Sequence, residues 1–123
     1  MTLSALAMGV AGVILSFLPH EISGYLHLTA GTIVDALILQ ILGALYFGFA
    51  MLNWTARANL IGGIYSRPVA IGNLAHFIIG ALALLKGYSS SFELIVLIMA
   101  MVYSGFAISF VMIFFIHPVK DKN

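Results

Sequence analysis

The sequence has no cysteine, three prolines and few charged side chains: five Lys or Arg and four Asp or Glu residues. Without cysteine the chain can form no disulfide, no thiolate zinc site and no thiol nucleophile. The net charge of +1 supplies no basic stripe of the kind that binds nucleic acid. Charged residues make up 7% of the chain, against about 25% in an average soluble domain. They cannot cover the surface of a water-soluble globule, so this class of protein is excluded.

Apolar residues dominate instead, with 63% hydrophobic residues and a mean hydropathy of +1.15. A helix that crosses ~30 Å of hydrocarbon at ~1.5 Å per residue needs ~20 apolar residues. Backbone groups in lipid must bond within their own segment, and no strand-like alternation is visible, so the segments are expected to be helices. The sequence therefore predicts an all-α integral membrane protein of one domain. Its four expected helices cover about residues 1–18, 33–54, 69–85 and 94–116.

The connections between these helices are short. Residues 1–18 are expected to form a retained helix, because the first four residues lack the basic start of a signal peptide. After Pro19, a mixed apolar and polar segment predicts a short helix in the membrane interface. The polar residues 86–91 predict a turn. Each long helix carries small residues along one face, which predicts a compact antiparallel four-helix transmembrane bundle.

Basic residues predict how the chain is oriented. With four spans, Arg57, Arg67, Lys120 and Lys122 lie on one side of the membrane and only Lys86 lies on the other. Basic residues stay on the cytoplasmic side of a membrane. We therefore expect a multi-pass protein of the cell inner membrane with both termini cytoplasmic, in contact with anionic lipids at that face.

His76 is the most unusual side chain, because ionisable groups within a span usually face the bundle interior or a cavity. The expected helix start places it about 10 Å below the interface. It could take part in a ligand pocket, a proton step or axial haem ligation, or it could be a neutral residue that holds the helices in register. No second histidine lies at a similar depth, so a bis-histidine haem is not expected, and no cofactor is predicted apart from the haem alternative. The candidate ligand-binding residues are His76, Asn73, Gln40, Tyr46, Tyr103 and Ser104.

The connection between the second and third helices is the other candidate site. Arginines beside a helix amino terminus can bind an anion, and aromatic residues with arginines can also anchor a chain at lipid headgroups. The candidate anion or headgroup residues are Arg57, Arg67, Ser66, Tyr65 and Trp54. No metal site is expected, because His20 and His27, seven residues apart, would stand ~10 Å apart along one helix.

Parts of the sequence resemble small four-span bacterial membrane proteins of uncharacterised function, and the layout is similar to the DoxX-like four-helix group. The resemblance implies a four-helix fold and a membrane location, and it implies no activity because it includes no catalytic signature. The residues that carry it are Leu42-Gly43-Ala44-Leu45-Tyr46-Phe47-Gly48, Asn53-Trp54, Arg57, Gly62-Gly63, Arg67-Pro68, Asn73 and His76-Phe77.

No Ser/His/Asp set, phosphate-binding glycine loop or His-Glu-x-x-His motif is present in the sequence. We therefore expect a protein that is not an enzyme and acts as an accessory or scaffold subunit, as a homo-oligomer or within a larger membrane complex. One alternative is a carrier or binder of a small molecule or ion with its pocket around His76. Another is a redox subunit that binds haem or quinone.

Overall fold

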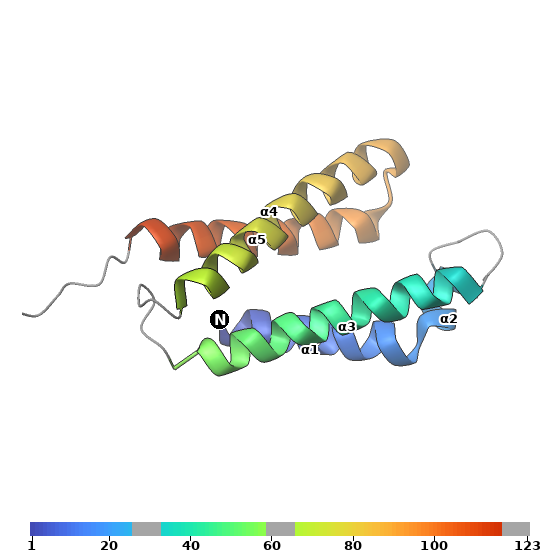
Figure 1. The fold of residues 1–123 in the computed structure, drawn as a ribbon. Helices are drawn as coiled ribbons and strands as arrows, with labels where there is room; N and C mark the ends of the chain where they lie inside the picture. Colours follow the sequence, from blue (N-terminus) through green and yellow to red (C-terminus); the bar gives the residue numbers. More distant parts are fainter. Residues whose placement is uncertain (26–32, 59–65, 117–123) are drawn as a thin grey trace, which may run out of the picture. The chain divides into compact units, whose positions relative to one another are not determined.

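The computed structural model describes residues 1–25, 33–58 and 66–116, and within them the chain is helical, without a strand. This confirms the all-helical prediction. Figure 1 shows the helices along the chain. They are α1 (Thr2–Phe17), α2 (Pro19–Tyr25), α3 (Ile33–Ala56), α4 (Ser66–Ser91) and α5 (Leu94–Ile116).

The chain divides into two compact units, an N-terminal unit of Met1–Arg57 and a C-terminal unit of Ala58–Asn123. In the first unit α1 and α3 run antiparallel, and in the second α4 and α5 do so (Figure 1). Each unit is therefore built on one helical hairpin. A single compact bundle of four helices stays a prediction.

Three helices are long and apolar enough to cross a membrane: α3, α4 from Arg67 onward, and α5 as far as Phe115. The helix α1 has 16 residues, or about 24 Å at ~1.5 Å per residue, which is less than the ~30 Å of a hydrocarbon core. It is followed directly by α2, at an angle of 96°. The structure thus contains three candidate spans, or four if the bent α1–α2 pair acts as one.

The bend between α1 and α2 has a local cause. The amide of Leu18 donates a hydrogen bond to the carbonyl of Ile14 at 2.9 Å and closes α1. Pro19 then begins α2, a position where its missing N–H costs nothing. Pro19 and Ser23 are buried, and α2 contacts both α1 and α3. The short helix predicted after Pro19 is therefore present, and its place in a membrane interface stays a prediction.

The expected turn over residues 86–91 is wrong, because α4 continues through this polar stretch to Ser91. The hydroxyls of Ser89 and Ser90 donate to the carbonyl of Lys86 at 2.7 and 3.3 Å, and Ser91 donates to Gly87 at 3.1 Å. Serine side chains that bond to the preceding turn in this way are compatible with a helix. Polarity alone therefore did not mark the end of α4, which also begins at Ser66 rather than at residue 69.

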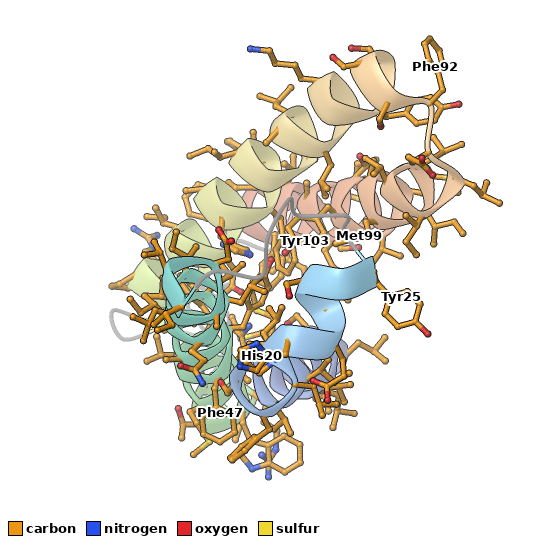
Figure 2. The ribbon with its side chains drawn as sticks, turned by 90° about the vertical axis from the view of Figure 1, so that its right-hand side faces the viewer. His20, Tyr25, Phe47, Phe92, Met99 and Tyr103 are labelled. Carbon is orange, nitrogen blue, oxygen red and sulfur yellow. The ribbon has the colours of Figure 1, made fainter. Side chains whose placement is uncertain are left out.

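The reversal of the chain falls at Phe92 and Glu93 instead. Phe92 has a φ of 53°, a left-handed conformation that commonly ends helices. Its amide donates to the carbonyl of Tyr88 at 2.8 Å, and the two rings meet edge to face with centroids 5.7 Å apart. The side chain of Phe92 is 75% exposed and projects from the turn in Figure 2.

The contact between α1 and α3 depends on two glycines. A Cβ at Gly12 would lie 2.8 Å from the amide nitrogen of Phe47 and 2.9 Å from the carbonyl oxygen of Gly43. A Cβ at Gly43 would lie 2.5 Å from Oγ and 2.7 Å from the amide nitrogen of Ser16. Both positions meet backbone atoms that cannot move aside. The two helices therefore approach as closely as they do because these residues have no side chain.

The small-residue face expected for the second span, Ala36, Gln40, Gly43 and Ala44, is buried only in part. Ala36 and Gly43 are buried, whereas Gln40 and Ala44 are exposed. The buried residues of α3 are Ala36, Leu39, Gly43, Ala50, Asn53 and Ala56. Since successive residues of a helix are about 100° apart, a shift of one position is enough to exchange a buried side chain for an exposed one.

We predict that Gly12→Ala destabilises the N-terminal unit, because the new methyl group forces α1 and α3 apart. Overpacking of this kind costs about 1–3 kcal/mol, which should appear as a lower midpoint in thermal unfolding followed by circular dichroism in detergent. Gly48→Ala is the matched control, because Gly48 is a glycine of the partner helix α3 and nothing lies within 4 Å of an added Cβ there. A Gly12→Ala protein as stable as the control would contradict this account of the contact.

Candidate functional site

His76 lies in the middle of α4 and contacts aromatic residues. Because α4 begins at Ser66, His76 is about 15 Å from the start of the helix at ~1.5 Å per residue, farther than the expected start at residue 69 implied. Its ring centroid lies 5.2 Å from that of Phe77 and 5.7 Å from that of Tyr103 on α5. The Nε2 atom of His76 is buried. The contact between His76 and Tyr103 thus joins the two helices of the C-terminal unit.

These residues belong to a larger aromatic group, which we call the His76 cluster: His76, Phe77, Tyr103, Phe106 and Phe110. The Phe77 ring stacks on Phe106 with centroids 4.9 Å apart and on Phe110 at 5.7 Å, and it meets Tyr103 edge to face at 5.4 Å. Phe77 and Phe110 are almost fully buried. The three phenylalanines were not among the predicted site residues, although Tyr103, Phe106 and Phe110 have helical spacing.

The position of Tyr103 depends on Gly80. A Cβ at Gly80 would lie 2.5 and 2.6 Å from two ring carbons of Tyr103. Gly80 follows His76 by one helical turn, so the ring of Tyr103 rests on the surface of α4 beside both residues. A larger residue at this position would displace the tyrosine from the histidine.

The other candidate ligand-binding residues are divided between the two units. Asn73 is fully buried on α4 and donates to the carbonyl of Val69 at 2.8 Å, while Ser104 is half-buried on α5. Gln40 and Tyr46 are on α3, in the N-terminal unit, where Gln40 is exposed and Tyr46 is half-buried. The C-terminal unit therefore brings His76 and Tyr103 together, and a pocket that includes Gln40 and Tyr46 stays a prediction.

The candidate anion-binding residues include one ordered pair at the end of α3. The guanidinium carbon of Arg57 lies 3.5 Å from the centroid of the Trp54 ring. Its Nη1 donates to the carbonyl of Trp54 at 3.0 Å, and both side chains are exposed. Three-residue spacing on a helix allows this contact, although the two residues were predicted only as separate members of the anion-binding set.

The remaining anion-binding candidates lie at the start of α4 or outside the described residues. Arg67 is exposed in the first turn of α4, which belongs to the C-terminal unit. Ser66 is the first residue of α4, and Tyr65 lies outside the described ranges. A single site formed by these residues and the Arg57–Trp54 pair stays a prediction.

The N-terminal unit has a buried amide and an apolar groove that sequence reasoning did not find. Asn53 on α3 is fully buried, and its Nδ2 lies 3.7 Å from the sulfur of Met8 on α1, which is a weak acceptor. An open groove of about 370 Å³ runs over the α1–α3 pair. It is lined by Ala5, Leu6, Gly9, Val10, Val13, Ile14 and Phe47. Figure 2 shows Phe47 projecting outward. No lining side chain is polar, so the groove suits hydrocarbon rather than a polar substrate.

Among the described residues, no group of three His, Cys, Asp or Glu side chains is placed to hold a metal ion. His20 is exposed on α2, and His27 lies outside the described ranges. Comparison with models of known protein families, with curated proteins and with solved structures finds no match. The similarity to the DoxX-like group therefore stays a prediction.

We predict that Gly80→Ala disrupts the His76 cluster, because the added methyl group overlaps the ring of Tyr103. The midpoint of thermal unfolding should fall, and the near-ultraviolet circular dichroism of the aromatic side chains should change. Gly105→Ala on α5 is the control, since nothing lies within 4 Å of an added Cβ there. In a Tyr103→Ala background the effect of Gly80→Ala should disappear. If it persists, the contact with Tyr103 is not its cause.

Proposed function

We propose that this chain is a small integral protein of a bacterial inner membrane that acts as an accessory or scaffold subunit, by association with other proteins or with its own copies. The observation that carries this proposal is the distribution of side chains on the helices. Large apolar residues are exposed on each long helix, such as Ile41 at 62%, Ile79 at 67% and Ile108 at 61%. Soluble monomers rarely expose apolar surface on this scale, whereas lipid or a neighbouring membrane helix can cover it.

The polar residues support association rather than catalysis. Asn53 and Asn73 are buried within the helical units, and His76 packs against aromatic rings. The groove on α1 and α3 has only apolar side chains. Because almost all described residues belong to helices, a partner would meet this protein within or beside the bilayer.

The orientation proposed from the basic residues does not depend on whether α1 spans. If α3, α4 and α5 each cross the membrane once, the end of α3, the start of α4 and the end of α5 lie on the same side of the membrane. That side carries Arg57, Arg67, Lys120 and Lys122, and we propose that it is cytoplasmic and faces anionic lipids. Only the amino terminus changes side between three and four spans. We propose four spans and two cytoplasmic termini.

We predict that single-cysteine labelling reproduces this topology, since the chain has no cysteine of its own. In intact cells a membrane-impermeant maleimide should label Ser90→Cys and should spare Ala58→Cys and Thr2→Cys until the cells are opened. Labelling of Thr2→Cys in intact cells would place the amino terminus outside the cell and would show that the chain has three spans. Labelling of Ala58→Cys in intact cells would overturn the proposed orientation.

We also predict that the protein forms a complex of fixed stoichiometry. Chemical crosslinking in native membranes, followed by mass measurement in mild detergent, should show either a homo-oligomer or a complex with a stoichiometric partner. Dilution of reconstituted protein with added lipid is the control, because random collisions decrease with dilution and a specific homo-oligomer persists. A monomer at native expression level, with no partner, would contradict the scaffold proposal.

The contact between His76 and Tyr103 favours one second candidate, a carrier or binder of a small molecule or ion with its site at the His76 cluster. In that case His76→Ala should abolish flux or ligand binding in proteoliposomes under conditions in which the variant keeps the helix content of the unchanged protein. If His76 only packs between the two helices, the substitution should lower the unfolding midpoint, and the unchanged protein should show no flux or binding to lose. A Soret band in the absorption spectrum of the purified protein would show instead that the protein binds haem, for which His76 is the candidate axial ligand.

A further inference from the structure

We propose that the Arg57–Trp54 pair at the end of α3 is a binding site for the headgroup phosphate of an anionic phospholipid. The inference rests on the proposed membrane location and adds to it a particular site and a lipid class. A site of this kind differs from general attraction of basic residues to a negative surface, because it requires one arginine held in one geometry.

The contacts of Arg57 hold its guanidinium group in place. The group lies over the Trp54 ring at 3.5 Å, and Nη1 donates to the Trp54 carbonyl at 3.0 Å. That bond uses one of the five N–H donors of the guanidinium, and the exposed side chain can offer others to a ligand. The planar arrangement of these donors matches two phosphate oxygens. Stacking on an aromatic ring reduces the entropy lost when such a ligand binds.

The acidic side chains of the N-terminal unit lie far from the pair. The carboxyl end of α3 stabilises the Arg57 cation, so the attraction for an anion comes from the guanidinium itself and not from the helix dipole. Asp35 is in the first turn of α3, about 33 Å away along the helix at ~1.5 Å per residue. Glu21 is in α2, which Figure 1 shows beside the opposite end of α3. Neither acid of the N-terminal unit is therefore placed to neutralise Arg57.

The position of the pair on α3 identifies the anion as part of a lipid. Met51 and Leu52 are exposed apolar residues immediately before it, at 49% and 50%. The helix thus changes from apolar to polar within one turn at Trp54. Tryptophan is enriched at this boundary between hydrocarbon and headgroups. A phosphate that meets Arg57 there is held at headgroup level, with the acyl chains beside the apolar part of α3.

The tryptophan of the proposed site allows a direct test, because Trp54 is the only one in the chain. The full chain would be reconstituted in vesicles that mix phosphatidylglycerol and phosphatidylcholine. Quenching of Trp54 fluorescence would then be compared between vesicles with bromine on the acyl chains of phosphatidylglycerol and vesicles with bromine on those of phosphatidylcholine. We expect an enrichment of about fivefold for the anionic lipid near Trp54, the fold-change that corresponds to about 1 kcal/mol for a basic residue at an anionic surface.

Variants separate the site from general charge attraction. Arg57→Gln should remove the enrichment, and Arg57→Lys should reduce it, because an ammonium group keeps the charge without the planar donors. Lys120→Gln, which removes one positive charge from the same proposed side of the membrane, is the control and should keep it. Quenching ratios are compared within each variant, since Arg57 itself affects Trp54 fluorescence. If Lys120→Gln acts as strongly as Arg57→Gln, or Arg57→Lys has no effect, the specific site is overturned.

The remaining outcomes distinguish this inference from the proposed function. Equal quenching by both brominated lipids would overturn the headgroup site and leave the membrane location intact. No quenching by either lipid would place Trp54 outside the bilayer and overturn both. Inorganic phosphate, added at constant ionic strength, should leave the enrichment unchanged. If it abolishes the enrichment, the pair binds free phosphate and the lipid proposal is wrong.

Discussion

The close approach of two helix backbones at Gly12 and Gly43 is the contact on which the N-terminal unit depends. Between these glycines, α1 and α3 meet backbone against backbone, with Ser16 and Phe47 beside them. A helix surrounded by lipid gains little from burying a large apolar side chain, because its surroundings are apolar already. Close packing of small residues then becomes a main source of association. The exposed isoleucines and leucines on the outward faces agree with this interpretation.

The C-terminal unit uses a different contact for the same purpose. Gly80 gives space on α4 for the ring of Tyr103 from α5, and Phe77 stacks with Phe106 and Phe110 along the hairpin. His76 lies at one end of this aromatic packing. Its ring is therefore held by its neighbours whether its role is to keep the helices in register or to contact a ligand.

The proposals for function follow from where the polar groups lie. Asn53 and Asn73 are buried within the units, while the Arg57–Trp54 pair is exposed at a helix end. Asn53 contacts Met8 across the α1–α3 pair, and an exposed guanidinium can meet an anion from outside. Association within the bilayer and contact with headgroups are therefore compatible roles for one small protein.

The sequence by itself determined that the chain is helical and where most of the long helices lie, because composition and the length of an apolar block are local properties. The helix expected over residues 94–116, for example, has the observed bounds of α5. It did not predict that α4 passes through Ser89–Ser91, because serine hydroxyls can bond to their own helix. Only the tertiary structure decided that Leu39 is buried while Gln40 is exposed, and that the ring of Tyr103 lies against Gly80. These choices depend on the rotation of each helix against its partner, and a difference of one residue, about 100°, changes which side chains meet.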